Sequence, residues 1–554
     1  MVTEHSSNRF FPAPRFGRAV GVAVGALFVL QAVLGFGGRV LSPSDLGQNL
    51  DQVKTAAFTA DMVLNGRREP VRWVLPRDNG GELSRKPPLV NWVGAPIAAA
   101  WDAATPPGTP WPEWVIKAPA ALFGAGTLLL TVVAGWRLLE RSPGEAESEA
   151  TAGGAGKNAP LLGLLAGGIW LAGPEPLKFV WFLRPDIALV ACMTAGWLLA
   201  TVLLERLARG EERGAAGLRV GLWASVGLGL LAKGPPALLV VAYLPLASWA
   251  LHRRPWLWLR TGIGWGLPLA LGIFGVWLLP ATAADPAYVR HGLIAAEVGG
   301  RIAPSGPGVA ERVLGVGSVI GWFFSRLGLG AVLFVAGLLA IGRGLVAQPG
   351  RAAHPAAAAA WFALLVLAVM GLVTHSGGGS YLAPAYPAAS VVAVVGFLRV
   401  SRRGSGRAQG AEAGGHAGPY WRRRAPVVLA AVCVCSTAAV VVREARFSRG
   451  ARTRAGVRLV MFADEIADRV GAAAVRFEGV GQNPLPTLLG RHPEQAEARV
   501  AEWIVRESIE WIDEAALVAE EFERLTGSGP RVQRLELIRV ADGGDVPEDE
   551  DGDI

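Results

Sequence analysis

The chain has 554 residues, of which 52% are hydrophobic and 18% are charged, and its mean hydropathy is +0.37. Soluble domains carry about 25% charged residues, so this composition is typical of a membrane protein. The apolar content excludes disorder for most of the chain, and the irregular spacing of the 72 glycines excludes a collagen-like repeat. The three cysteines lie in apolar runs, so they predict neither a disulfide framework nor a Cys/His zinc cluster.

The net charge of +8 does not indicate a nucleic-acid-binding protein, because the basic residues cluster in short loops between apolar runs. A membrane helix needs about 20 mostly apolar residues, and the sequence predicts about eleven of them. Basic residues gather in alternate loops from the first loop onward, which predicts a cytoplasmic N-terminus in the inner (plasma) membrane. With an odd number of spans, the C-terminus is extracytoplasmic. The runs are 19–38, 118–136, 158–174, 187–204, 220–232, 234–252, 261–284, 327–342, 352–398 (two spans) and 425–442.

Three segments on the predicted outer side are larger than turns. Residues 39–114 include a helical stretch, Leu46–Leu64, whose apolar face predicts a helix along the membrane surface. The second segment is 285–320. The third, 446–541, alternates strand-like and helical runs, which predicts a small α/β domain. The strand-like runs are 457–462, 474–477, 503–505 and 532–540, and the helical ones are 464–470 and 513–525. The predicted domains are a transmembrane module at 1–445, the α/β domain at 446–541 and an acidic disordered tail at 542–554.

The candidate chemical groups fall on the predicted outer side, near the membrane boundary, whereas the spans are nearly free of charge. A transporter more often places ionisable groups in mid-membrane, so this pattern favours chemistry at the outer interface on a lipid-borne substrate. These groups are Asp51, Lys54, Lys86, Asp186, Lys233, Glu297 and Arg301.

Several of these residues also have a purely structural interpretation. Asp51 is three residues from Lys54 and suits an ion pair on one helix face. Asp186 follows Arg184-Pro185 and suits the N-cap of the fourth span. Lys233 suits a side chain that snorkels to the interface, and Arg301 one that anchors a loop.

A series of short motifs on the outer side, within about residues 15–400, resembles the bacterial GT-C glycosyltransferases. That family includes the aminoarabinose (lipid A) transferases and the related protein mannosyltransferases. The motifs are Asp51-Gln-Val-Lys-Thr-Ala-Ala-Phe-Thr-Ala-Asp-Met62 with Gly66, Leu75-Pro-Arg-Asp-Asn-Gly80, Lys86-Pro-Pro-Leu89 with Trp92, Glu113-Trp114 with Lys117, Arg184-Pro-Asp186, Lys233-Gly-Pro235, Glu297-Val-Gly-Gly-Arg301, and Tyr381-Leu-Ala-Pro384 with Tyr386-Pro387.

The resemblance implies an all-α polytopic GT-C fold and a role for each matching residue. Asp51 takes the proton of the acceptor hydroxyl as the glycosidic bond forms, and Asp186 is the second carboxylate, orienting acceptor or base. The leaving phosphate needs cations rather than a general acid. Those donor phosphate-binding groups are Lys86, Lys233, Arg301 and the Tyr381 hydroxyl.

The sequence departs from the family at two positions. The family usually has an acidic residue, a proposed metal ligand, where this chain has Arg85, and it commonly has a lysine at the position of Gly377. A guanidinium group has no lone pair to give to a metal. We therefore predict no cofactor and no metal ligand among the motif residues. A divalent metal would need substitute ligands nearby, for which Glu82, Asp285 and His291 are the candidates.

The sequence thus predicts an inverting glycosyltransferase that moves a hexose or pentose from a polyprenyl-phosphate donor to an extracytoplasmic lipid, glycan or protein. Such a reaction belongs to cell-envelope biogenesis, for example of lipopolysaccharide. Three alternatives stay open at this stage. The first is a protein O-mannosyltransferase, the second a transporter or flippase of lipid-linked sugars without catalysis. The third is a non-catalytic binding protein, which the departures at Arg85 and Gly377 leave open.

Overall fold

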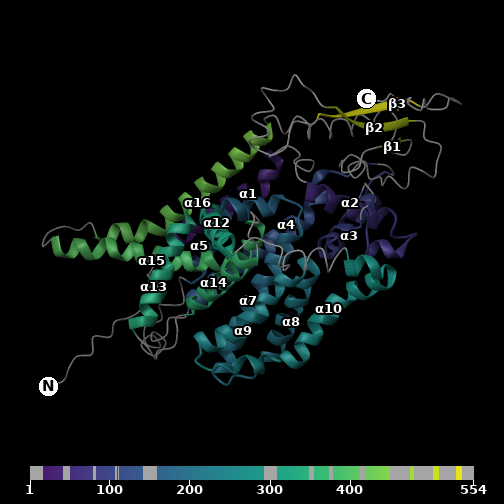
Figure 1. Cartoon of the computed structure of the whole chain (residues 1–554). Helices are drawn as coiled ribbons and strands as arrows, with labels where there is room; N and C mark the ends of the chain where they lie inside the picture. The colour runs from purple at the N-terminus through teal and green to yellow at the C-terminus, as the bar shows by residue number, and fades with distance from the viewer. Residues whose placement is uncertain are drawn as a thin grey trace, which may run out of the picture. The chain divides into compact units, whose positions relative to one another are not determined.

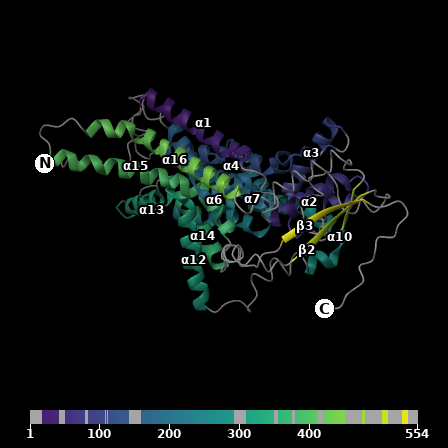
Figure 2. The same cartoon turned by 90° about the horizontal axis from the view of Figure 1, so that it is seen from above.

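The structure is a computed structural model. It describes residues 17–41, 50–78, 81, 83–106, 109, 111–140, 159–291, 309–347, 355–373, 379–411, 418–449, 475–478, 503–510 and 532–539. Within them the chain is mostly helical (Figures 1 and 2). It divides into two compact units. The first comprises Met1–Ser42, Arg85–Val90 and Pro119–Phe447, and the second Pro43–Ser84, Asn91–Ala118 and Ser448–Ile554. The three-domain division predicted from the sequence stays a prediction.

The helices follow the apolar runs of the sequence. The α-helices are α1 (Arg18–Leu41), α2 (Leu50–Leu64), α3 (Leu89–Ala104), α4 (Glu113–Glu140), α5 (Ala159–Ala172), α6 (Pro174–Trp181), α7 (Pro185–Ala208), α8 (Ala215–Lys233), α9 (Leu239–Ala250), α10 (Ile263–Ala284), α12 (Val309–Leu327), α13 (Gly330–Ala347), α14 (Ala356–Val373), α15 (Ala385–Ala411) and α16 (Gly418–Arg449). Short 3-10 helices are η2 (Pro70–Trp73), η4 (Pro235–Leu238), η5 (Leu257–Thr261) and η7 (Gly379–Leu382).

A helix lies at every run for which the sequence predicts a membrane span. Among the described residues, six helices are long and apolar enough to cross a membrane: α1, α4, α7, α8, α10 and α16. The pair α12 and α13 meets the same test as one span bent by 111°. Four further apolar helices, in α5, α9, α14 and α15, are shorter. The chain is therefore a multi-helix candidate membrane protein, and the count of eleven spans stays a prediction.

Helices α7 and α8 form the antiparallel hairpin that positions the site, and α10 packs against α8 (Figure 1). Close approach of α8 and α10 depends on small residues: a Cβ at Gly227 would come within 2.9 Å of the Ala270 carbonyl oxygen. Helix α8 ends at Lys233, between the apolar runs 220–232 and 234–252. Gly234 then takes a positive φ of 81°, a backbone conformation that glycine adopts without steric cost.

Helices α13 and α15 pack backbone against backbone. A Cβ at Gly396 would lie 1.9 Å from the Leu333 carbonyl oxygen, and one at Gly337 would lie 2.1 Å from the Val392 carbonyl oxygen. Packing of this kind by small residues is common between membrane helices, where no hydrophobic effect drives association. These two glycines therefore fix how closely the pair approaches.

The first and last helices of the first unit are joined by buried side-chain hydrogen bonds. Gln31 of α1 donates to the Gly168 carbonyl of α5 at 2.7 Å and to the Thr437 hydroxyl of α16 at 3.0 Å. Ser436 donates to the Ala172 carbonyl at 3.0 Å. In an apolar environment an unpaired amide or hydroxyl is costly, so these contacts fix α1 and α16 against α5.

In the second unit, helix α2 is confirmed as a helix, but it is not the amphipathic surface helix that the sequence predicts. Val53 and Ala57 of the predicted apolar face are buried, yet so are polar residues such as Gln52 and Asp61. If one face of α2 lay in water, the polar side chains of Gln52 and Asp61 would be exposed there. Their polarity is accommodated by hydrogen bonds instead: Asp61, for example, accepts from the Asn65 amide and from the Arg77 backbone N–H, each at 2.7 Å.

The C-terminal part of the described chain is a three-stranded sheet of β1 (Val475–Glu478), β2 (Trp503–Glu510) and β3 (Val532–Arg539). β2 is central, with Val475 opposite Trp503 in a parallel pair and Trp503 opposite Arg539 in an antiparallel one. Three of the four predicted strand runs coincide with these strands. The first strand run, the two helical runs and the tail 542–554 lie outside the described residues, so the α/β character of the domain stays a prediction.

Candidate active site

A buried ion pair joins the two ends of the α7–α8 hairpin. Asp186 lies in the first turn of α7 and Lys233 is the last residue of α8, and the Lys233 ammonium donates a hydrogen bond to Asp186 Oδ1. The Asp186 side chain is 2% exposed and that of Lys233 is 8% exposed. The two residues are 47 positions apart, and the antiparallel packing of the two helices brings them together.

Further cations surround the Asp186 carboxylate. Arg184 Nε is 3.4 Å from Asp186 Oδ2, and half-buried Lys86 also interacts electrostatically with the carboxylate. Three cations thus interact with the Asp186 carboxylate. Asp186 Oδ2 is buried and accepts no hydrogen bond from the described residues. The arrangement therefore offers positive charge to an anion and one carboxylate oxygen to a hydrogen-bond donor.

Tyr381 belongs to the same cluster. It lies in η7, before α15, and the Lys233 ammonium lies 4.1 Å from the centre of its ring. A cation over an aromatic face is stabilised by the ring quadrupole. Of the residues that the sequence singles out, the structure thus gathers Asp186, Lys233, Lys86 and Tyr381 in one unit, each from a different segment of the chain.

The other sequence-predicted site residues are only partly described. Asp51 lies in the first turn of α2, and its side chain is outside the described part of the structure. Glu297, Arg301 and Gly377 all lie outside the described residues. Their roles stay predictions, as do those of the residues gathered around Asp186.

Two of the structural alternatives are wrong. The N-cap of α7 is Arg184, without a side-chain capping hydrogen bond, and the Asp186 side chain pairs with Lys233 instead. Lys233 does not snorkel to the surface, because its side chain is buried against Asp186. The third alternative, an ion pair of Asp51 with Lys54, stays a prediction, because the Asp51 side chain is outside the described part of the structure. Lys54 forms an ion pair with Asp78 at 3.3 Å.

The described residues do not fit a metal centre. Nowhere among them do three His, Cys, Asp or Glu side chains gather closely enough to hold a metal ion. Arg85, at the family's metal-ligand position, cannot ligate, and Glu82 lies outside the described residues. Asp285 is engaged, since its Oδ1 accepts the Tyr288 backbone N–H at 2.8 Å.

Sequence reasoning did not find a second buried polar cluster in the first unit. Glu175 of α6 is 3.7 Å from Arg326 of α12, and Arg326 stacks over Trp322 at 4.2 Å. Buried Tyr386 of α15 interacts electrostatically with both Glu175 and Arg326 and stacks on Phe323. The short helix α6 links α5 to Arg184 and Asp186, so this pair fixes the segment that leads into the site. The one sequence feature that indicates this cluster is the position of Glu175, nine residues before the Arg184-Pro-Asp186 motif.

No protein-family model matches the sequence, and no curated protein matches it. The fold is similar to that of ArnT from Cupriavidus metallidurans. The structure of ArnT bound to undecaprenyl phosphate has a TM-score of 0.61 and 16% sequence identity, covering 90% of this chain and 94% of that one. The apo structure has a TM-score of 0.60 and 17% identity, covering 91% and 95%. At this identity the likeness shows the fold, which is the GT-C fold implied by the motifs.

Proposed function

We propose that the chain is an inverting membrane glycosyltransferase that transfers a sugar from a polyprenyl-phosphate donor to an extracytoplasmic acceptor. The observation that carries the proposal is the gathering of three cations, Lys86, Arg184 and Lys233, around the buried Asp186 carboxylate. This cluster is set at the end of a candidate membrane span. The fold is that of ArnT, which has been crystallised with undecaprenyl phosphate.

The cluster suits the leaving group of such a reaction. When the glycosidic bond breaks, the polyprenyl phosphate takes the bonding electrons and gains negative charge, so cations held in place beforehand lower the barrier. Lys86 is only half-buried, so its ammonium group is more accessible to the phosphate than that of Lys233. Lys233, fixed between Asp186 and the Tyr381 ring, adds positive charge that needs no reorientation as the bond breaks.

The acceptor requires a base. A sugar or lipid hydroxyl is a poor nucleophile, and a carboxylate that takes its proton as the new bond forms contributes about 10²–10⁴-fold to the rate. We assign this role to Asp51 on α2. Asp186 holds Lys233 through Oδ1, and its Oδ2 suits a hydrogen bond from the acceptor or from the residue that orients it. Attack opposite the leaving phosphate inverts the anomeric centre.

The test is transfer by the purified full-length chain in liposomes. Polyprenyl-phosphate hexoses and pentoses serve as donors, and an extract of envelope lipids, glycans and proteins serves as acceptor. We expect labelled sugar to move to an acceptor in wild type, and the Asp51→Asn variant to lose this while still binding polyprenyl phosphate. Glu69→Gln, which changes an exposed carboxylate of the same unit, is the matched control and keeps activity. Movement of intact lipid-linked sugar across the bilayer with no transfer would identify a flippase instead.

A further inference from the structure

Helix α12 packs against both of the segments that lead to the site. It contacts α6, which leads into Asp186, and η7, which contains Tyr381. The approach to α6 is close, because a Cβ at Gly173, the N-cap of α6, would lie 3.3 Å from the Arg326 carbonyl oxygen. The end of α12 therefore lies directly against the start of α6.

Side chains from the end of α12 extend this contact in two directions. Arg326 lies 3.7 Å from Glu175 in the first turn of α6. Phe323, one turn earlier, stacks on Tyr386 at the start of α15, with ring centroids 5.1 Å apart and planes within 8°. Tyr386 also interacts electrostatically with Glu175 and Arg326. We refer to these four side chains as the α12 cluster.

Two short stretches of chain connect the α12 cluster to the site. Glu175 precedes Asp186 by eleven residues, and Tyr386 follows Tyr381 by five. At the other ends of these stretches, Lys233 lies between the Asp186 carboxylate and the Tyr381 ring. The contacts thus form a closed ring. Whether Lys233 reaches both partners depends on their separation, and therefore on how α6 and α15 are held against α12.

Ion pairing alone does not account for the burial of Glu175. Its Oε2 is buried and accepts no hydrogen bond from the described residues, and the Tyr386 hydroxyl is likewise buried without a hydrogen bond among them. Arg326 Nε at 3.7 Å is too far for a hydrogen bond. Polar atoms in this state cost free energy, and a well-packed apolar pair is often equally or more stable. A charge that is costly to bury but joins two helices points to a role in their placement.

We propose that the side chains of the α12 cluster are positioning groups for the transfer reaction. They hold α6 and α15 against α12, which keeps Asp186 and Tyr381 at the separation where Lys233 contacts both. They act through Lys233, whose charge, fixed beforehand, stabilises the leaving phosphate. This inference rests on the proposed function for its effect on transfer, whereas its effect on Lys233 is measurable without any substrate.

Lysine labelling tests the geometry directly, because the chain has only six lysines. The purified chain in detergent is reductively methylated, and the modification of each lysine is followed by peptide mass spectrometry. The Lys233 side chain is 8% exposed, so we expect slow modification in wild type. We expect Glu175→Gln and Arg326→Gln each to speed the modification of Lys233 several-fold, because α6 and α15 are no longer tied together. Lys117, a buried lysine of the second unit, should stay protected.

The same variants should slow transfer. We expect kcat to fall roughly 10–100-fold, since a misplacement of about 1 Å can cost about 10²-fold. The KM for the donor should change little, because Lys86 is retained. Arg326→Lys keeps a positive charge beside Glu175, so we expect it to restore both the protection of Lys233 and most of kcat.

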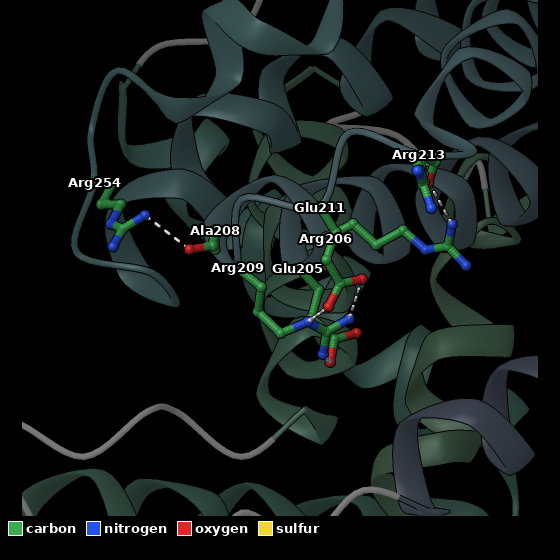
Figure 3. A network of polar contacts seen from close by, with 7 residues as sticks. All are labelled: Glu205, Arg206, Ala208, Arg209, Glu211, Arg213 and Arg254. Carbon is green, nitrogen blue, oxygen red and sulfur yellow. Dashed lines mark hydrogen bonds and ion pairs between the residues drawn. The ribbon is translucent and has the colours of Figure 1, made fainter.

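The matched control is Arg209→Gln, in the exposed network at the opposite, arginine-rich end of the α7–α8 hairpin (Figure 3). Arg209 lies between Glu205 and Glu211, at 3.1 and 2.6 Å. Like Arg326→Gln, the control removes one arginine from its acidic partners, but in a part of the chain that is not in the α12 cluster. We expect it to leave the labelling of Lys233 and kcat at wild-type values.

The other outcomes overturn the inference. Unchanged labelling of Lys233 and unchanged kcat in Glu175→Gln would do so while leaving the proposed function intact. A parallel rise at Lys117 would show general unfolding, and an equal effect of Arg209→Gln would trace the change to net charge. If Glu175→Gln does not fold, Arg326→Gln, whose side chain is 31% exposed in wild type, removes the same pair. If wild type transfers no sugar, the proposed function fails and the labelling of Lys233 alone decides.

Discussion

Removing either partner of the Asp186–Lys233 pair should destabilise the chain more than removing both. Asp186→Asn leaves a lysine whose side chain is 8% exposed without its carboxylate, and Lys233→Met leaves a carboxylate that is 2% exposed with Arg184 at 3.4 Å. Breaking a buried pair from one side typically costs about 3–5 kcal/mol. Because Arg184 still compensates Asp186, we expect Lys233→Met at the lower end of that range and Asp186→Asn at the upper end.

The double variant Asp186→Asn/Lys233→Met removes both buried charges. Replacement of a complete buried pair by neutral groups is often neutral for stability, so we expect the double variant to unfold with nearly the wild-type free energy, about 3–5 kcal/mol above either single variant. Equilibrium unfolding of the purified protein in mixed micelles measures the three variants. Transfer activity should stay lost in the double variant, which separates the chemical contribution from folding. Free energies of unfolding that add within about 0.5 kcal/mol would show that the two side chains do not interact.

Three other predictions test the site and its support. Asp51→Asn should lower turnover by about 10²–10⁴-fold with little change in the thermal midpoint, whereas near wild-type turnover would make Asp51 an ordinary surface carboxylate. Lys86→Ala should weaken binding of polyprenyl phosphate, and Lys86→Arg should rescue it only in part, because a point charge and a planar fork fit a phosphate differently; equal binding by all three proteins would place the phosphate elsewhere. Gly396→Ala should destabilise the packing of α13 on α15 by about 1–3 kcal/mol through overpacking. The control Gly342→Ala should not, because its Cβ meets nothing within 4 Å. If the two variants had similar midpoints in thermal unfolding, the two helices would separate at little cost.

The sequence predicts the helices well because a span is defined by its own composition. A helix lies at each apolar run, and α8 ends at Lys233, between the runs 220–232 and 234–252. It predicts less well where a helix is not purely apolar. Helix α3 contains Asn91, Pro96 and Asp102, and the bent pair α12–α13 breaks at Gly328, with φ at 59°. Whether such segments become helices is decided by packing partners that local composition does not contain.

The site was predictable as a set of residues but not as a set of pairs. Asp186 and Lys233 each stand out as charges at the end of an apolar run, and the motif resemblance marks both. Their contact depends on two spans running antiparallel with their ends in register. The burial of α2 was unpredictable for a similar reason, because Asp61 becomes tolerable in the interior only once Asn65 and Arg77 donate to it.

The two ends of the α7–α8 hairpin show what kind of charge each can hold. At the arginine-rich end the charges are exposed, so their ion pairs add little to stability and desolvation costs nothing. At the other end, Asp186 and Lys233 have given up their water, and a well-packed apolar pair of similar volume would be equally or more stable. Folding therefore does not account for this pair. Stabilisation of a leaving phosphate requires positive charge that is held in place beforehand, and Lys233 is held between Asp186 and the Tyr381 ring. That is the physical reason to place the chemistry at Asp186 and not at the more numerous charges at the other end of the hairpin.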